Sequence, residues 1–473
     1  MLLSDLNNII DIKKKFNYKK NKKFTKITST SKLADKNTLL IIKPNKSFKK
    51  KYLKEAIKKN IPGIISKKLI KDIKTTQYIV DDVENESKKI LKKLFPFSPN
   101  NTIAITGTNG KTSVAWYISE ILRINKINSK MLGTLGFFIN GKKKNETYLT
   151  TPPFEEIYQY GNNKFKRNYN FIFEASSHAL SQNRLDDYNV DLAAITNISQ
   201  DHLDFHKNEK NYVKAKFSLF KKYLNKEGVA IVNSRLKFFN LLIKFLKKNK
   251  IKTTIFGSKD IFFSNEKKKL ILKIYNKKYN LKNLNLSELQ KENIECAISC
   301  LLNIGFSPKL IINSLSKIIN PPGRMDEIKF KKKNTTIIID YAHTPDALKK
   351  ILLSQTINKK KPSLVFGCGG DRDKSKRKIM ALVAHKYANK VYVTDDNPRY
   401  EDPSKIRKEI LNYCKKGVEF SSRKKAIFYA ITNIDQKEIL VIAGKGHEKF
   451  QIFKNQKVAF DDYKIAEKIV KNL

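Results

Sequence analysis

The sequence has few cysteines and no long apolar run. Four of its 473 residues are cysteine, and Cys296, Cys300, Cys368 and Cys414 are too few and too unevenly spaced for a disulfide framework. No segment approaches the roughly 20 uncharged apolar residues that a membrane span needs. The N-terminus carries Asp5 before any hydrophobic run, unlike a secretory signal. These absences predict a protein of the reducing cytoplasm that does not enter a membrane.

Acidic residues are also scarce. There are 44 Asp and Glu against 96 Lys and Arg, which leaves a net charge of +52 at pH 7. Such an excess is typical of nucleic-acid-binding proteins, but here the lysines are scattered through every segment beside abundant Asn and Ile. A polyanion site concentrates its charge and interleaves aromatic residues. We therefore interpret the charge as compositional bias and predict no specific nucleic-acid partner. A basic, RNA-associated phosphate-loop NTPase is the alternative from another functional class.

The length of the chain and its pattern of apolar and polar residues predict several domains. A chain of 473 residues with 40% hydrophobic content is too long for one ordinary core and apolar enough for two or three. From Asn101 onward, short apolar runs end in polar clusters and precede helical patterns, which indicates buried parallel strands with ligand-binding loops at their carboxyl ends. Two prolines and a glycine near residue 321 mark a break. We predict an α/β protein with domains 1–98, 99–321 and 322–473.

The apolar runs predict eight strands in the second and third domains. The interval 235–285 is strand-like and lysine-rich, and its pattern assigns no clear order of elements. The predicted strands are Thr102–Ile105, Phe171–Phe173, Leu192–Ile195, Val229–Val232, Thr336–Ile339, Leu364–Phe366, Val391–Val393 and Ile439–Ile442.

The sharpest local signal is a glycine-containing loop between a strand and a helical run. Its glycines let the backbone close around an anionic group, Lys111 supplies positive charge for phosphates, and the Thr112 hydroxyl is suited to magnesium. The spacing Gly-x-x-Gly-Lys-Thr is shorter than the standard phosphate loop, but the flanking strand and helix favour that interpretation over a chance turn. The predicted ATP-binding loop residues are Gly107, Thr108, Asn109, Gly110, Lys111, Thr112 and Ser113.

Polar clusters at two later strand ends offer candidate metal ligands. Glu174 ends one predicted strand, and another is followed by a segment that contains His202 and His206. A carboxylate oxygen such as that of Glu174 suits magnesium. The two histidines are four residues apart, but no glutamate base lies between them as in a zinc protease, so we rank zinc low. Five of the six histidines fall in such clusters: His178, His202, His206, His343 and His447.

A series of ordered segments resembles the Mur ligases, the ATP-dependent amide-forming enzymes of peptidoglycan precursor synthesis. The resemblance runs from Asn101 to Phe460, about three quarters of the chain. The resembling segments are Thr106–Ser113, Leu149–Pro152, Glu174–Leu180, Thr196–His206, Tyr212–Phe220, Pro322–Glu327, Asp340–Leu348, Gly367–Arg377, Asp396–Arg399 and Gly444–Glu448.

The resemblance implies a three-domain architecture and a two-step ligation. A central phosphate-loop ATPase domain on a mostly parallel sheet would precede a C-terminal Rossmann-like domain. ATP would phosphorylate a peptide carboxylate, and an amine would attack the resulting acyl phosphate, with magnesium as cofactor. The implied catalytic residues are Lys111, His202 and Lys216, and the implied metal ligands are Thr112, Glu174, His202 and Lys216, the last as a carbamylated lysine. Further ATP contacts would come from Asn293, Arg324 and Asp340.

Within the family, the chain most resembles the members that add meso-diaminopimelate to UDP-N-acetylmuramoyl-L-alanyl-D-glutamate. Both ends of that amino acid are zwitterionic. Paired arginines could bind its carboxylate groups, and a glutamate could bind its distal ammonium group. The resemblance implies a soluble monomer that binds only these small-molecule substrates and ATP. Its implied diaminopimelate contacts are Arg372, Asp396, Asn397, Pro398, Arg399, Gly444 and Glu448. Its implied contacts to the nucleotide-sugar peptide are Ser31, Thr150, Thr151, Ser176, Gln182 and Arg184.

The N-terminal region departs from the family pattern. The family usually shows Asp-Ser-Arg in the turn for the uridine end, whereas this chain has Thr30-Ser31-Lys32. Two relatives within the fold are alternatives, namely folylpolyglutamate synthase and the ligase that adds a D-alanyl dipeptide. The Asp396–Arg399 and Gly444–Glu448 segments disfavour both.

Overall fold

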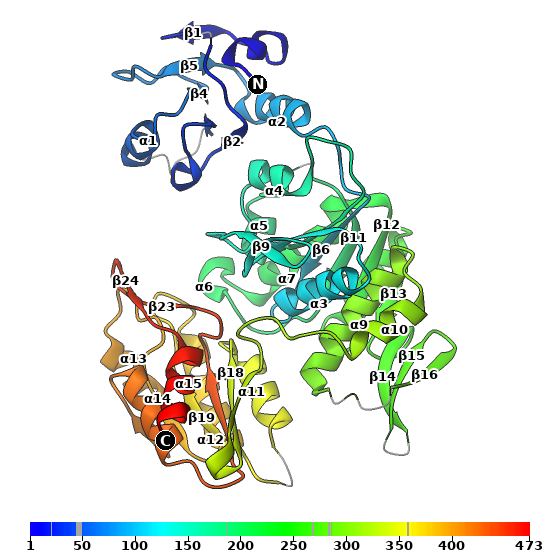
Figure 1. Cartoon of the computed structure of the whole chain (residues 1–473), viewed down its shortest axis with the longest axis vertical. Helices are drawn as coiled ribbons and strands as arrows, with labels where there is room; N and C mark the ends of the chain where they lie inside the picture. The colour runs from blue at the N-terminus through cyan, green and yellow to red at the C-terminus, as the bar shows by residue number, and fades with distance from the viewer. Residues whose placement is uncertain are drawn as a thin grey trace.

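The chain folds into three lobes, each built around its own sheet (Figure 1). The computed structural model describes residues 1–19, 21–43, 50–186, 188–266, 269–281, 284, 286–356 and 359–473. Within these residues, no helix is both long enough and apolar enough to span a bilayer. The N-terminal lobe lies at one end of the molecule, the central lobe, which begins at β6, in the middle, and the C-terminal lobe at the other end.

The N-terminal lobe is a small sheet of order β1-β5-β4-β3-β2, parallel except for the pair β1 and β5. Its core combines Leu39, Ile41, Ile65 and Tyr78, all buried. The elements of the lobe are η1 Leu3–Asn8, β1 Lys14–Phe16, β2 Lys26–Thr28, η2 Ser31–Leu33, β3 Thr38–Ile42, α1 Lys50–Ile57, β4 Gly63–Ser66, β5 Thr76–Ile79 and α2 Val83–Leu94.

The central lobe contains a large sheet of order β16-β15-β14-β13-β12-β11-β6-β10-β7-β8-β9. Its strands are β6 Asn101–Thr106, β7 Ser129–Gly133, β8 Gly136–Ile139, β9 Lys142–Asn145, β10 Asn170–Glu174, β11 Val190–Ile195, β12 Leu224–Asn233, β13 Lys252–Phe256, β14 Ile261–Glu266, β15 Lys269–Ile274 and β16 Lys277–Leu281. Its helices are α3 Lys111–Ile124, α4 Phe154–Gly161, α5 Ser177–Ser181, α6 Leu203–His206, α7 Glu209–Ser218, η3 Leu219–Tyr223, α8 Phe239–Lys248, α9 Glu288–Asn303 and α10 Pro308–Leu315.

Strand β6 positions the central site. It pairs in parallel with β10 on one side and β11 on the other, with Ile105 opposite Glu174 and Thr106 opposite Ile195. Because parallel strands end at the same edge of a sheet, the segments that follow these three strands meet there. Continuous apolar runs such as Ile103–Ile105 are buried on both faces, as a parallel sheet covered by helices requires.

The described residues of the unassigned interval 235–285 form one side of this sheet, with β16 at its edge. They fold into α8, the parallel strand β13, and an antiparallel meander of β14, β15 and β16. Alternate residues of the meander, such as Leu270, Leu272 and Ile274, are buried while their neighbours are more exposed. This one-faced burial gives a weaker sequence signal than the doubly buried central strands.

The C-terminal lobe is a sheet of order β17-β18-β22-β19-β20-β21, parallel except for β17. All eight predicted strands lie within observed strands of the central and C-terminal lobes. The C-terminal elements are β17 Asp326–Phe330, η4 Lys331–Lys333, β18 Thr335–Asp340, α11 Pro345–Ser354, β19 Ser363–Phe366, α12 Ser375–Tyr387, β20 Val391–Val393, α13 Pro403–Leu411, β21 Gly417–Glu419, α14 Arg423–Thr432, β22 Ile439–Ala443, β23 Phe450–Phe453, β24 Gln456–Ala459 and α15 Asp462–Asn472.

Candidate functional site

The loop between β6 and α3 is shaped by two glycines. Gly107 and Gly110 have backbone φ angles of 144° and 85°, which residues with a side chain rarely adopt. A Cβ at Gly107 would lie 1.9 Å from Thr196 Oγ1, and one at Gly110 would lie 2.3 Å from Asn293 Oδ1. The loop backbone therefore passes so close to its neighbours that only glycine fits at these two positions.

Lys111 begins α3 and bends back over the loop. Its Nζ donates hydrogen bonds to the carbonyl oxygens of Gly107 and Thr108, both at 2.9 Å. Burial lowers the pKa of Lys111, while the nearby carboxylates of Glu174 and Asp201 act in the opposite direction. A cation at a helix N-terminus, surrounded by backbone amides, is an arrangement that receives phosphate groups.

Thr112 and Glu174 form the acidic side of the site. Thr112 Oγ1 donates to both carboxylate oxygens of Glu174 at 3.0 Å. The backbone nitrogen and hydroxyl of Thr134 donate to the same carboxylate at 2.8 and 3.1 Å. Hydroxyl and carboxylate oxygens are the ligands that magnesium prefers, so this pair fits a magnesium ion on its cavity side.

Lys216 lies behind the loop on α7. Its side chain is buried, and its Nζ lies 4.4 Å from the centroid of the Tyr212 ring. Among the described residues, no carboxylate pairs with this ammonium group. Burial, reinforced by Lys111, lowers the pKa of Lys216 well below its usual range. The Tyr212 hydroxyl in turn lies 2.9 Å from Thr108 Oγ1, so one aromatic ring connects the lysine to the phosphate loop.

Three histidines pack together beside the acidic side of the site. The ring of His178 lies 4.6 Å from that of His202 and 5.6 Å from that of His206. Burial lowers the pKa of His202 to about 3 and that of His206 to about 4, so both rings are neutral at pH 7. His202 lines a cavity between the central and C-terminal lobes, whereas His206 is buried against Ser177.

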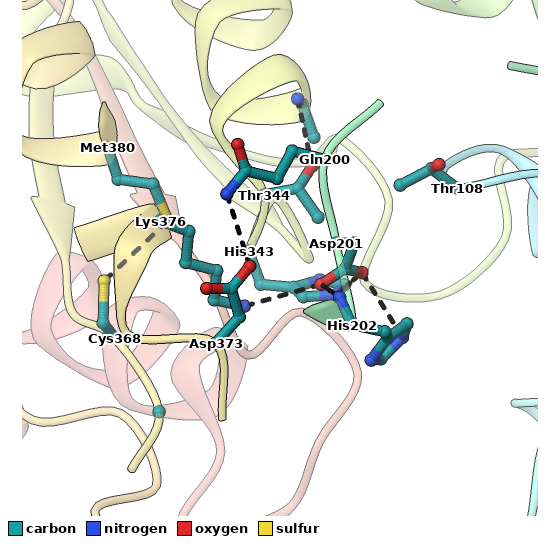
Figure 2. Close-up of polar contacts among 12 residues, drawn as sticks. Thr108, Gln200, Asp201, His202, His343, Thr344, Cys368, Asp373, Lys376 and Met380 are labelled. Atoms are coloured by element: carbon teal, nitrogen blue, oxygen red, sulfur yellow. Dashed lines mark hydrogen bonds and ion pairs between the residues drawn. The ribbon is translucent and has the colours of Figure 1, made fainter. Parts of the chain in front are cut away.

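Asp201 joins the central lobe to the C-terminal lobe (Figure 2). One carboxylate oxygen lies 3.4 Å from His202 Nε2 and 3.9 Å from His343 Nε2, and the other lies 3.9 Å from Lys376 Nζ. Burial raises the pKa of Asp201, but His202, Lys376, His343 and the backbone amide of His202 outweigh that effect and hold the pKa at about 2. Gln200 Nε2 adds a contact of 2.8 Å to Ser375 Oγ across the same boundary.

A cavity of about 320 Å³ lies between these two lobes. The central lobe contributes the phosphate loop, Glu174, Ser176, His202 and Thr150 to its lining. The C-terminal lobe contributes a second set: Arg324, Tyr341, His343, Gly367, Cys368, Gly369, Arg372, Asp373, Lys376, Asp396, Asn397, Arg399, Gly444 and Glu448. Segments that are more than 300 residues apart in the sequence thus share one cavity.

A smaller cavity of about 70 Å³ adjoins the phosphate loop. Asn293, Arg324 and Asp340 line it together with Tyr117. Arg324 stacks on Tyr341, with its guanidinium carbon 4.3 Å from the ring centroid, and its buried Nε has no hydrogen-bond partner among the described residues. Asp340 accepts hydrogen bonds from two backbone amides of the C-terminal lobe, and burial raises its pKa.

The residues predicted to bind the nucleotide-sugar peptide form two groups. Thr151 Oγ1 donates to the Glu174 carbonyl at 2.7 Å, Arg184 donates to the Thr151 carbonyl at 2.9 Å, and Gln182 accepts from Arg184. Ser31 lies apart in the N-terminal lobe, where its hydroxyl donates to Glu55 at 3.0 Å.

The first turn of α4 connects these two groups. Glu156 accepts from the hydroxyls of Thr28 and Thr30 at 3.2 and 3.0 Å, and Glu155 accepts from the backbone nitrogen of Ser29 at 3.0 Å. The helix that follows Thr150 and Thr151 therefore holds the turn that leads to Ser31.

The comparisons with known proteins decide the family. Residues 105–302 match the model of the Mur ligase middle domain, and residues 323–446 match that of the Mur ligase, glutamate ligase domain. A protein of Rickettsia bellii (strain RML369-C), named UDP-N-acetylmuramoyl-L-alanyl-D-glutamate--2,6-diaminopimelate ligase, is 38% identical over 406 residues, which cover 82% of this chain and 84% of the relative. This chain belongs to the Mur ligase family.

Other relatives of this Mur ligase carry the same enzyme name. The Rickettsia conorii (strain ATCC VR-613 / Malish 7) protein is 35% identical, with 92% of this chain and 94% of the relative covered. A solved structure with that enzyme name has a TM-score of 0.59 at 26% identity and covers 100% of this chain and 99% of its own. The MurF ligase of Thermotoga maritima shares the fold, with a TM-score of 0.68 at 15% identity over 94% of this chain and 98% of its own.

Sequence reasoning overlooked several residues of this Mur ligase site. Asp201, Tyr212, His343 and Lys376 make contacts around the cavity but were not among the predicted site residues. All four lie inside segments that resemble the family, and that position was the available signal. Apart from this position, Lys376 does not differ from the many other lysines. Conversely, the predicted residues Ser31 and Lys216 do not line the large cavity.

Proposed function

We propose that this Mur ligase uses ATP to add meso-diaminopimelate to UDP-N-acetylmuramoyl-L-alanyl-D-glutamate, through an acyl phosphate, in peptidoglycan precursor synthesis. One observation carries the proposal. The segments Asp396–Arg399 and Gly444–Glu448 line the same cavity as the phosphate loop. An amine bound by the first two would therefore face a phosphorylated carboxylate held near the third. The names of the relatives support this assignment.

The phosphate loop would hold the terminal phosphates of ATP. Lys111 already points toward the loop, and its move from two carbonyl oxygens to a phosphate would pair its charge with an anion. Asn293, Arg324 and Asp340 would receive the nucleoside part in the adjoining cavity. Thr112, Glu174, His202 and a carbamylated Lys216 would hold magnesium. When bound, this metal neutralises the charge between phosphate and carboxylate.

The environment of Lys216 supports its carbamylation. Burial and the nearby Lys111 lower the pKa of Lys216 and so favour its neutral form, which is the form of an amine that attacks carbon dioxide. The nitrogen–carbon bond forms as one carbon–oxygen π bond of carbon dioxide opens, the electron pair stays on that oxygen, and the nitrogen loses a proton to solvent. The resulting carbamate anion would attract Lys111 and would face the metal as an oxygen ligand.

The C-terminal lobe would orient the incoming amino acid. Arg399 lies in a backbone conformation with φ 53° and donates to the Gly370 carbonyl at 2.7 Å. Burial, together with the nearby charge of Arg372, lowers the pKa of Arg399. The two cations would bind a carboxylate, while Asp396 and Glu448 would bind an ammonium group. The peptide of the other substrate would contact Thr150, Thr151, Ser176, Gln182 and Arg184.

We propose the domain division 1–98, 99–321 and 322–473, which the three sheets support. We also propose that the uridine end of the substrate binds at Ser31 in the first domain. We propose further that the enzyme acts as a monomer in the cytoplasm.

Substrate-dependent ADP release tests the function directly. Purified enzyme with ATP and magnesium is expected to release ADP only when the UDP-muramoyl dipeptide and an amino acid are both present, and faster with meso-diaminopimelate than with L-lysine. Equal or reversed rates would refute the amino-acid assignment. Retention on a polyanion column at ~0.5 M salt without ligase turnover would favour the RNA-associated alternative.

A further inference from the structure

Lys445 is a lysine with no exposed surface. It follows β22 in the turn 444–448, and its side chain lies inside the C-terminal lobe behind the cavity wall. Its Nζ donates to Glu448 Oε2 at 2.9 Å and to Asn397 Oδ1 at 3.1 Å. The cavity lining contains Asn397 and Glu448 but not Lys445, so the Lys445 side chain contacts the site through these two residues.

Asn397 completes a closed network with this lysine. Its Nδ2 donates to Glu448 Oε2 at 2.9 Å, and its Oδ1 also accepts from the backbone nitrogen of Ile452 at 3.0 Å. The backbone nitrogen of Glu448 donates to the carbonyl of Lys445 at 3.0 Å and closes the turn. Lys445 therefore ties together the two segments that were assigned to the amino acid, Asp396–Arg399 and Gly444–Glu448.

A buried ion pair of this kind is poorly explained by stability alone. Burying an ammonium group is costly, and apolar residues of similar size often stabilise a fold as well or better. Pairing does, however, fix the orientation of the partner groups. In this network, Glu448 Oε2 is occupied twice, whereas Oε1 has no hydrogen-bond partner among the residues that the structure describes. The free oxygen belongs to a residue that lines the cavity.

We propose that Lys445 is a positioning residue that sets amino-acid specificity through Glu448. The two hydrogen bonds to Glu448 Oε2 fix the carboxylate, so that Glu448 Oε1 remains as an acceptor for the ammonium group of the amino acid. The charge of Lys445 also offsets that of Glu448, so the wall attracts a lone ammonium less than an unpaired carboxylate would. Such a wall favours a zwitterionic end, which also engages Arg399, over the bare ammonium end of L-lysine. The inference rests on the proposed function.

Two substitutions separate the charge of Lys445 from its hydrogen bonds. Lys445→Met removes both, whereas Lys445→Gln keeps an amide donor near Glu448 and Asn397 without the charge. We expect K445M to raise the KM for meso-diaminopimelate roughly tenfold or more and to lower the preference for meso-diaminopimelate over L-lysine by a similar factor. K445Q should keep more of the affinity but lose much of the preference. The KM values for ATP and the UDP-muramoyl dipeptide should stay within about twofold.

A matched control comes from another lysine of the same lobe. Lys333 Nζ also donates to two acceptors, the carbonyl oxygens of Thr432 and Ile434, and it does not line the cavity. K333M should therefore leave every KM and the amino-acid preference unchanged. Melting curves identify any variant that fails to fold. If K445M does not fold, K445Q, which is close in size to lysine, is used for the test.

The outcomes distinguish this inference from the function on which it rests. A folded K445M or K445Q with unchanged preference, or with equal rises in all three KM values, would overturn the role of Lys445 and leave the ligase assignment intact. Wild-type enzyme without release of ADP that depends on diaminopimelate would instead overturn the proposed function.

Discussion

Thr112 Oγ1 lies 3.0 Å from both carboxylate oxygens of Glu174. The two residues are 62 positions apart, and they meet because β6 and β10 are parallel neighbours that end at the same edge of the sheet. A Cβ at Gly133 would lie 2.1 Å from Glu174 Oε1, so the end of β7 also encloses this carboxylate. The pair is therefore held in place by three strands before any ligand binds.

Replacing Glu174 by glutamine should abolish most turnover. The amide has nearly the same shape and still accepts from Thr112, but it removes the charge that we assign to magnesium. We expect E174Q to lower kcat for ADP release roughly 100-fold or more, with a melting temperature close to that of wild type. Activity near the wild-type level at saturating magnesium would contradict the assignment of Glu174 as a metal ligand.

Lys216→Ala should lower turnover strongly, and short carboxylates should partly restore it. Acetate or formate would occupy the space of the missing carbamate and supply an oxygen ligand. Lys214→Ala is the matched control, because Lys214 lies on the same helix but is exposed. It should leave turnover unchanged. The measurement is ADP release with increasing carboxylate, and an absence of rescue would leave Lys216 as a plain structural lysine.

Asp201→Asn should weaken the contact between the central and C-terminal lobes. The amide cannot neutralise Lys376 or pair with His343, which both come from the C-terminal lobe. We expect turnover to fall about tenfold or more, because the two walls of the cavity would no longer be held at one spacing. Small-angle scattering should show a larger radius of gyration than wild type. An unchanged radius with full activity would exclude a role for Asp201 in lobe contact.

Glu156 predicts a change of stability with pH. Burial, reinforced by Glu155, raises its pKa in the folded protein from 4.5 to about 7. Between these values the unfolded chain releases this proton and the folded chain keeps it. Stability is therefore lost as pH rises through this window, by up to ~1.4 kcal/mol per pH unit. Glu156→Gln should match wild type near pH 4.5 and be more stable than wild type at pH 8, as measured by denaturant unfolding.

The neighbouring Glu155 gives the opposite expectation and serves as the control. Its buried carboxylate lies 3.1 Å from Lys43 Nζ and accepts from the backbone nitrogen of Ser29. Glu155→Gln removes the charge partner of Lys43 and should destabilise the protein at pH 8. A pH profile of E156Q that runs parallel to that of wild type would show that Glu156 is ionised in the folded state.

Local signals were sufficient for much of the sheet structure. Doubly buried strands such as β6 and β22 read as continuous apolar runs, and their ends were marked by the polar residues that follow them. The meander of β14, β15 and β16 was not assigned, because its strands bury one face and its lysines obscure the alternation. The roles of individual site residues, including Lys216 and Ser31, stay predictions.

By itself, the amino-acid sequence determined the glycine-containing loop after β6, the residues that form the central parallel strands, and the segments that resemble the family. Each of these depends on residues within a few positions of one another in the sequence. Only the tertiary structure decided which distant groups share an environment. The contacts of Asp201 with His343 and Lys376, of Tyr212 with Thr108, and of Lys445 with Asn397 depend on how strands and lobes pack. A lysine among 96 Lys and Arg carries no sign of its burial in the sequence, since burial and pairing arise only when remote segments meet.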